Sequence, residues 1–172
     1  AKENNLSVHS KSDSQDICFI PDGDYKDFLE NNSDIEPKKG NIILNDKVIG
    51  THTGLYKYTI GQRKGLGISN KVPLFVLGFN SDKNEVIVGE ESQLYKDEII
   101  VNNINLLLID EIKEPIKVNV KTRYSAKEAK ATIIQKDNEI IVKFDEPQRA
   151  ITKGQSVVMY NGDVVVGGGI IC

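Results

Sequence analysis

Alternation of apolar and polar residues dominates the second half of the chain and predicts strands. Apolar residues recur at every second position over most of this half, which is the period of a strand with one buried face. Asn161-Gly162 interrupts the last of these segments and predicts a type I′ hairpin turn. Short strands at regular spacing are typical of a small antiparallel barrel or sandwich, and a closed barrel leaves no exposed sheet edge. The predicted strands span 74–79, 84–89, 98–108, 116–124, 129–136, 139–145 and 156–171.

Helical spacing is confined to a short stretch near the N-terminus. Tyr25, Phe28 and Leu29 fall at i, i+3 and i+4, which predicts one helix from an Asp cap at position 22 or 24 to about residue 31. A polar linker follows at 32–40. Strands are then expected over 41–44, 47–51 and 55–60, with Asn45-Asp46 as a two-residue hairpin turn between the first two.

These elements predict a mainly β protein in three parts: a short helical remnant at 1–36, a small β-rich central domain at 37–72, and a C-terminal antiparallel β-barrel at 73–172. A length of 172 residues allows one or two domains with a buried core. No apolar run approaches the roughly 20 residues of a membrane-spanning helix, so no membrane partner is expected.

Charge is distributed unevenly along the sequence. Residues 1–36 hold three basic and nine acidic residues, residues 37–72 hold seven and one, and residues 73–172 hold twelve and fifteen. A compact basic block between acidic flanks is a candidate surface for a polyanion. The alternative is an unevenly charged but otherwise ordinary solvated surface.

One predicted barrel strand places its cations on a single face. In the segment 116–124, Lys117, Lys121 and Arg123 fall on the face opposite the apolar residues. Residues two positions apart on a strand, such as Lys121 and Arg123, are separated by about 6.6 Å. Such a line of cations is suited to binding phosphates along a nucleic-acid strand. The alternative is the solvated face of a half-buried strand. Tyr124 falls on the opposite face and reaches RNA only if the strand ends or twists there.

Two cysteines are too few for a disulfide framework or a structural zinc site, so a reducing compartment and no metal are expected. Cys18 lies in an apolar run, where a cysteine is often a small buried hydrophobe. A reactive thiol there needs a cation or a helix N-terminus to favour the thiolate, and the predicted helix begins just downstream. His52, between glycines, has no partner at useful spacing and is expected to be structural.

Three separated segments resemble the tRNA-specific 2-thiouridylase family. They are 13–21 (DSQDICFIP), 50–67 (GTHTGLYKYTIGQRKGLG) and 144–155 (FDEPQRAITKGQ), and the ending at 160–171 fits as well. The Ser-Gly-Gly-x-Asp-Ser loop of the family's ATP site and its second cysteine have no counterpart in this sequence. The resemblance therefore implies a C-terminal portion that lacks the PP-loop ATP domain, with 1–36 as the end of the catalytic domain.

The resemblance implies a sulfur transfer to tRNA. Family members activate C2 of the wobble uridine with ATP, and a persulfide sulfur then replaces the oxygen as AMP leaves. Cys18 matches the persulfide cysteine, which a cysteine desulfurase or another sulfur-donor protein loads. ATP is the implied cofactor, bound by the PP-loop domain and not by this chain, and the implied location is the cytoplasm. The chain alone is expected to be inactive.

The resemblance also implies contacts with tRNA. Arg123 and Tyr124 match an Arg-Tyr pair at the end of a barrel strand, and Gln155 matches the Gln of a Gly-Gln step. The glycine-rich loop that carries Gln62, Arg63 and Lys64 falls in the central domain, on the substrate side. By its own pattern this loop is not a P-loop, and an ordinary surface turn is the alternative.

Two other functions stay open at this point. One is a barrel module that binds tRNA without catalysis, with Cys18 merely structural. The other is an independent thiol-redox or sulfur-carrier protein. That protein would need a resolving thiol near Cys18, and the sequence offers only Cys172.

Overall fold

The computed structural model describes residues 20, 25–33 and 35–172 of the chain. The chain divides after Pro37 into two units. In the described part of the first unit, the helix α1 (Tyr25–Asn32) lies where the spacing of apolar residues predicts it. At the end of the helix, the N–H and the hydroxyl of Ser33 both donate to the carbonyl of Leu29. Cys18 lies outside the described residues.

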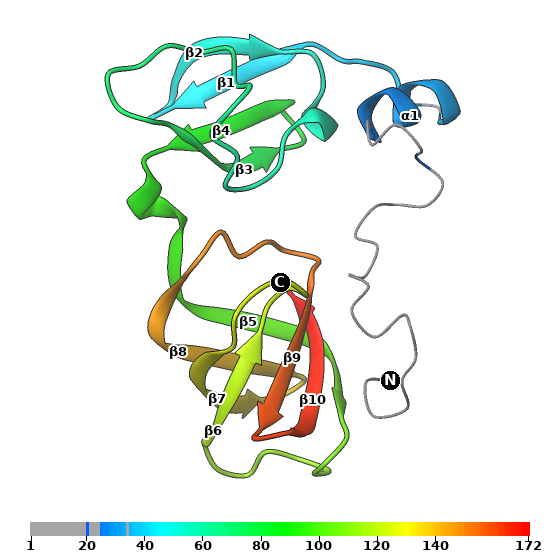
Figure 1. Ribbon diagram of the computed structural model, residues 1–172, viewed down its shortest axis with the longest axis vertical. Coiled ribbons are helices and arrows are strands. Elements are labelled where there is room, and N and C mark those ends of the chain that lie inside the picture. The colour runs from blue at the N-terminus through cyan, green and yellow to red at the C-terminus, as the bar shows by residue number, and fades with distance from the viewer. Residues whose placement is uncertain (1–19, 21–24, 34) are drawn as a thin grey trace, which may run out of the picture. The chain divides into compact units, whose positions relative to one another are not determined.

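The second unit begins with a four-stranded sheet in the order β2-β1-β4-β3 (Figure 1). Asn45 and Asp46 have positive φ angles of 48° and 62°, as a type I′ turn requires, so the predicted hairpin is confirmed. β1 also pairs with β4 in parallel, while β3 and β4 are antiparallel. The strands are β1 (Gly40–Leu44), β2 (Lys47–His52), β3 (Phe75–Asn80) and β4 (Glu85–Gly89).

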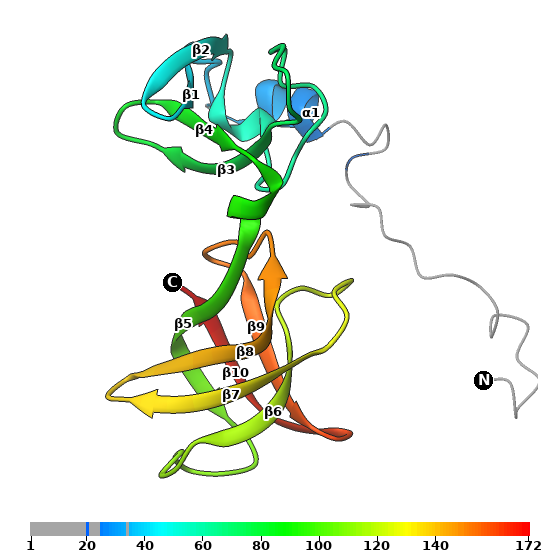
Figure 2. The same ribbon diagram turned by 90° about the vertical axis from the view of Figure 1, so that its left-hand side faces the viewer.

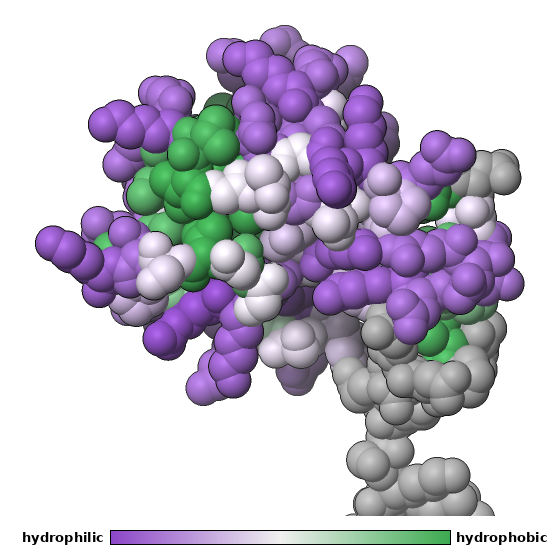
Figure 3. Space-filling model, turned by 90° about the horizontal axis from the view of Figure 1, so that it is seen from above, coloured by the Kyte–Doolittle hydropathy of each residue, from purple (hydrophilic) through white to green (hydrophobic). Residues whose placement is uncertain are grey.

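The core of this sheet lies on one of its faces. Ile42, Val76 and Val86 are fully buried there, and burying each such side chain contributes about 1.5–3 kcal/mol. The opposite face keeps apolar residues in contact with solvent: Ile43 is the cross-strand partner of both Val48 and Ile87, and Val48 is 59% exposed. Seen from above, apolar side chains gather within a largely hydrophilic surface (Figure 3).

Two expectations for the central domain are wrong. The segment 55–60 is not a strand: it starts with the 3-10 helix η1 (Leu55–Lys57), and Leu55 and Tyr58 pack on the core at a spacing of three residues, which a short window does not separate from alternation. The domain also extends beyond residue 72, because β3 and β4 join the sheet of β1 and β2. That pairing is long-range, so the local pattern assigned both strands to the barrel.

The rest of the second unit is a closed barrel in the order β10-β5-β8-β7-β6-β9 (Figures 1 and 2). The predicted mainly β fold with an antiparallel barrel is confirmed. A 3-10 helix, η2 (Glu91–Leu94), precedes the barrel. The strands are β5 (Tyr95–Leu106), β6 (Ile116–Lys121), β7 (Ala129–Lys136), β8 (Glu139–Arg149), β9 (Ser156–Asn161) and β10 (Val164–Ile171).

Some barrel boundaries differ from the predicted ones. β6 ends at Lys121, three residues before the predicted end, and β8 continues to Arg149. The turn between β9 and β10 consists of Gly162 and Asp163, one position later than predicted, and only Gly162 has a positive φ (58°). It is therefore not the type I′ turn that Asn161-Gly162 suggested.

The glycine run near the end of β10 has a steric reason. A Cβ at Gly168 would lie 2.6 Å from the carbonyl oxygen of Val157, on the neighbouring strand β9. Backbone cannot move away from such a contact without breaking the ladder. Only glycine therefore lets β10 lie between β5 and β9 at this point.

Candidate nucleic-acid interface

The barrel residues predicted to contact tRNA come together at one end of the barrel. Antiparallel pairing places Lys121, at the end of β6, opposite Val158, near the start of β9. Arg123 and Gln155 lie just beyond these two positions, so the strand order brings them to the same end. Tyr124 follows in the turn between β6 and β7.

Arg123 is partly committed to the fold. Its guanidinium donates a hydrogen bond to the carbonyl oxygen of Ala150, which also accepts one from the Thr152 hydroxyl at 3.3 Å. Ala150 has a positive φ of 54°, and its N–H donates to the carbonyl of Leu94 at 2.9 Å. Arg123 thus holds a strained corner in place. A guanidinium has five N–H donors, so the remaining donors can serve a ligand.

Tyr124 meets the condition that the alternation pattern set. β6 ends at Lys121, so Tyr124 is not held on the core side of a strand. Its side chain is 78% exposed. An exposed aromatic ring on a turn is the kind of group on which an unpaired RNA base stacks.

Gln155 carries an unsatisfied acceptor. Its side-chain Oε1 is buried, and no hydrogen-bond donor reaches it within the described part of the chain. The backbone is satisfied separately: the N–H of Ile171 donates to the Gln155 carbonyl at 2.9 Å. Buried amide oxygens usually have a partner, so this one is a candidate for an N–H or O–H donor of a bound molecule.

Two of the three cations predicted to form a line lie on β6, namely Lys117 and Lys121, whereas Arg123 lies beyond the end of the strand. Val118 and Val120 are buried, whereas Lys117 is exposed, and Asn119 and Lys121 are half-buried on the other face. β6 and β7 together carry four lysines and no acidic residue. Lys113, Lys143 and Arg149 form ion pairs, whereas the lysines of β6 and β7 form none with a described residue. Lys117, Lys121 and Lys130 are therefore available to an anionic ligand, whereas Lys136, at the end of β7, lies opposite the acidic Glu139.

In the basic loop of the central domain, Gln62 has a structural role, whereas Arg63 and Lys64 are exposed. Gln62 shapes the loop: its Oε1 accepts from the Thr59 N–H and its Nε2 donates to the Lys64 carbonyl, both at 2.9 Å. Arg63 instead lines a cavity of about 430 Å³ together with Lys71. Gly65, with φ at 75°, lines the same cavity, where glycine lets a ligand approach the backbone closely. Gln62 is thus used within the loop, while Arg63 and Lys64 are exposed.

His52 is a structural residue, as expected. It is 2% exposed, its Nδ1 accepts from the Gly54 N–H at 3.1 Å, and its Nε2 lies 3.0 Å from the Asn84 carbonyl. Because Nδ1 accepts a hydrogen bond, Nε2 is the ring nitrogen that donates to the Asn84 carbonyl. The ring meets Tyr58 edge-on. Burial raises the pKa of the Tyr58 phenol and Lys57 partly offsets this, so Tyr58 is neutral at physiological pH.

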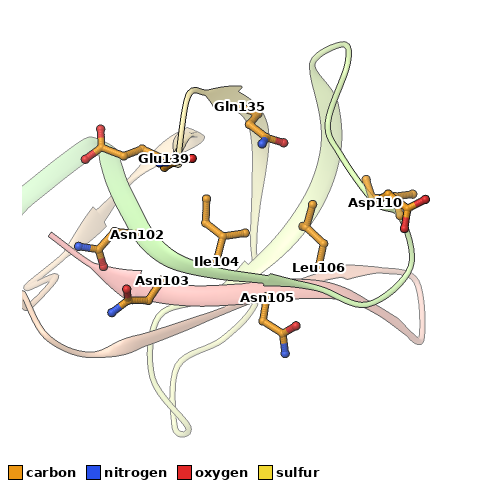
Figure 4. A pocket seen from close by; sticks show the side chains of 10 residues that line it. Asn102, Asn103, Ile104, Asn105, Leu106, Asp110, Gln135 and Glu139 are labelled. Carbon is orange, nitrogen blue, oxygen red and sulfur yellow. The ribbon is translucent and has the colours of Figure 1, made fainter.

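A cavity in the barrel is lined by acidic and not by basic charged residues (Figure 4). It measures about 630 Å³ and lies between β5, the start of β8 and the loop that follows β5. Ile104 and Leu106 point into it, toward Gln135 (Figure 4). The charged residues of its lining are the carboxylates of Asp110 and Glu139. Such a lining repels a polyanion, so this cavity is a poor candidate for a nucleic-acid interface.

The described residues contain no cluster of metal-ligating side chains. Among them no helix is long and apolar enough to cross a membrane. Sequence reasoning did not select Lys130 and Tyr160, which strand pairing places beside Asn119 from either side. Only the order of the strands could have identified them, because the three residues are far apart in the sequence.

Two family models match the chain in succession. A tRNA methyl transferase PRC-barrel domain matches residues 26–90, and an aminomethyltransferase beta-barrel domain matches residues 96–171. The division between the models falls between β4 and β5, where the central sheet ends and the barrel begins.

Curated relatives match along nearly the whole chain. The tRNA-specific 2-thiouridylase MnmA of Clostridium botulinum (strain Alaska E43 / Type E3) is 50% identical over 99% of the chain, and that of Acetivibrio thermocellus is 49% identical over 99%. The enzyme of Clostridioides difficile is 47% identical over the same share. The chain spans about half the length of these relatives, 48% in each case. The chain belongs to the tRNA-specific 2-thiouridylase family.

Proposed function

We propose that this chain is part of a tRNA-modifying sulfurtransferase that thiolates C2 of the wobble uridine. It supplies the sulfur-carrying Cys18, the central domain and a tRNA-binding barrel. The observation that carries the proposal is the identity of about half of all residues, over 99% of the chain, with proteins named tRNA-specific 2-thiouridylase. The enzyme acts in the cytoplasm.

ATP activation of the uridine belongs to another part of the enzyme. The sequence has no Ser-Gly-Gly-x-Asp-Ser loop, and the glycine-rich loop at 61–67 has neither the spacing of a P-loop nor a following helix in the structure. The residues of this chain therefore do not fit ATP. Sulfur carriage and tRNA binding are the two tasks that its own residues perform.

Cys18 carries the sulfur. Its thiolate attacks the outer sulfur of a persulfide on a cysteine desulfurase or another sulfur-donor protein. A new S–S bond forms on Cys18 as the S–S bond of the donor breaks, and the donor leaves as a thiolate. The terminal sulfur of a persulfide ionises easily and is a strong nucleophile, which suits it to attack an activated ring carbon.

The barrel and the central loop bind the tRNA. Tyr124 stacks on an unpaired base, the free donors of Arg123 bind phosphate, and the orphan oxygen of Gln155 accepts a donor from the RNA. Arg63 and Lys64 bind phosphates on the central domain. Lys117, Lys121 and Lys130 also support a narrower function, that of a tRNA-binding module without catalysis.

Persulfide mapping separates these two functions. The chain is incubated with a cysteine desulfurase and cysteine, free thiols are blocked, and the added sulfur is located by peptide mass spectrometry. Sulfur on Cys18 that is absent from a Cys18→Ser variant, and retained in a Cys172→Ser variant, supports the sulfurtransferase. A chain that binds tRNA in a salt-dependent manner but never carries sulfur on Cys18 is a binding module only.

A further inference from the structure

A second cationic surface lies on the outside of the barrel, where β9, β6 and β7 lie side by side. It contains a cavity of about 330 Å³. This groove does not include Arg123, Tyr124 or Gln155 of the barrel end. Its polar lining consists of Lys117, Asn119, Lys130, Asp145, Tyr160 and Asn161.

Strand register fixes the order of the side chains in this groove. Asn119 is the cross-strand partner of Tyr160 on β9 and of Lys130 on β7. Directly opposed residues point to the same face with their Cβ atoms about 5 Å apart, so a phenol, an amide and an ammonium stand in one row. Lys117 lies on the same face of β6, about 6.6 Å from Asn119 along the strand. The amide therefore has an aromatic ring on one side and a cation on two others.

The two lysines of the groove are available to a ligand. Both Lys117 and Lys130 are exposed, and neither forms an ion pair with any described residue. The three strands that carry the row contain no acidic residue. The carboxylate in the lining is Asp145, which comes from β8. The groove thus has a local surplus of positive charge in a chain whose net charge is −3.

This combination of groups matches one unpaired nucleotide. A tyrosine ring provides a stacking surface for a base of any identity. An asparagine amide offers a donor and an acceptor to a base edge. Lysines on either side bind the flanking phosphates. A carboxylate repels a free inorganic anion, whereas in RNA it accepts a hydrogen bond from a base amino group or a ribose 2′-OH. An acidic protein surface would use the lysines but not the ring.

We propose that this groove binds an unpaired nucleotide of the tRNA substrate, with Tyr160 under the base, Asn119 at its edge, and Lys117 and Lys130 on the phosphates. The inference rests on the proposed tRNA-binding function and adds a contact that the family resemblance did not point to. It makes the RNA path along the barrel longer than the single end that contains Tyr124.

The test measures binding of an unmodified tRNA transcript to the 172-residue chain by fluorescence anisotropy. Tyr160→Leu keeps apolar bulk but removes the ring, so the affinity falls about tenfold, whereas Tyr160→Phe binds like the parent. In the Lys117→Ala/Lys130→Ala double variant, the slope of log K against log salt becomes shallower by about two. Lys136→Ala, at the far end of β7 and opposite the acidic Glu139, leaves both quantities unchanged.

Photo-crosslinking keeps the test valid if Tyr160→Leu fails to fold. A tRNA that contains 4-thiouridine is irradiated with the parent chain, and a crosslink within 156–161 supports the groove. Unchanged affinity in the Tyr160 and lysine variants, with binding still weakened by Tyr124→Ala, overturns the groove and leaves the barrel end intact. A parent chain that does not bind tRNA at low salt overturns the proposed function as well. Lysine variants that lose only desulfurase docking assign the surface to a protein and also overturn the groove.

Discussion

The two sides of the barrel share one fold and differ in chemistry. β6 and β7 carry four lysines and no acid, whereas β5 and β8 carry five acidic and three basic residues. On the β5–β8 side the cation Lys143 is paired with Glu98 at 3.5 Å. The cavity at the end of β5 is lined by amides together with Asp110 and Glu139. The lysines of the β6–β7 side have no such partners among the described residues.

This difference shows why net charge is a poor guide to what such a domain binds. Exposed charges are screened over about 8–10 Å at physiological salt, so a polyanion responds to the nearest cations and not to the overall −3. A strand pattern that excludes acids from two adjacent strands is enough to create a side with unpaired cations. On the β5–β8 side, acidic and basic residues occur together, so that ion pairs cancel part of the positive charge.

Charge reversal on the β6–β7 side has the largest expected effect. The triple variant Lys117→Glu/Lys121→Glu/Lys130→Glu loses on the order of 100-fold in tRNA affinity at 100 mM salt, because three counterion-releasing contacts become repulsive. Fluorescence anisotropy provides the measurement. The matched triple Lys113→Glu/Lys136→Glu/Lys143→Glu has the same net charge and loses far less. Equal losses of tRNA affinity in both triple variants would show that the total charge matters and its location does not. The proposed difference between the two sides of the barrel would then be wrong.

Arg123 differs from the lysines of β6 and β7 because its side chain stabilises the fold. Arg123→Ala removes the charged donor from the Ala150 carbonyl and lowers the free energy of unfolding by about 2 kcal/mol. Arg123→Lys recovers part of this, whereas Lys117→Ala changes stability by less than about 0.5 kcal/mol because that side chain is exposed. Urea unfolding measures all three. An Arg123→Ala variant as stable as the parent would mean that the guanidinium serves only the ligand.

For the cavity at the end of β5, which amides line, we expect the reverse: a gain in stability without a change in tRNA binding. Asn102 has a buried Oδ1 that no described donor reaches. Asn102→Leu removes this unsatisfied acceptor at similar volume and raises the free energy of unfolding by about 1 kcal/mol, with tRNA affinity unchanged. Thermal unfolding and anisotropy check the two halves. Weaker tRNA binding in this variant would place the cavity in the interface after all.

The smallest effect is expected at the paired cation of the β5–β8 side. Lys143→Ala breaks an exposed ion pair with Glu98 and costs at most about 0.5 kcal/mol of stability. Its tRNA affinity stays within about twofold of the parent in the same anisotropy assay, because the lysine is already neutralised by its partner. A loss as large as that of Lys130→Ala would remove the distinction between paired and unpaired lysines.

Local pattern predicted the barrel better than it predicted the central domain. The alternation over 129–136 predicted both ends of β7 correctly, and Asn45-Asp46 predicted the first hairpin, because both features depend on neighbours in the sequence. The sheet of β1 to β4 depends on a parallel pairing between β1 and β4 that no local signal encodes. Arg123 was selected both by the alternation in the segment 116–124 and by the family resemblance, but its bond to Ala150 needed the fold. Tyr160 and Lys130 needed the strand order, because Asn119 joins them only across the barrel.

The central claim is that tRNA covers the β6–β7 side of the barrel and leaves the β5–β8 side open. Lysine acetylation footprinting tests it directly: the chain is treated with a brief pulse of acetylating reagent with and without tRNA, and each lysine is quantified by mass spectrometry. The account predicts that tRNA protects Lys117, Lys121 and Lys130 and leaves Lys113 and Lys143 as reactive as before, together with Lys136, which lies at the far end of β7 opposite Glu139. Protection of the second group, or uniform protection of all six, would contradict it.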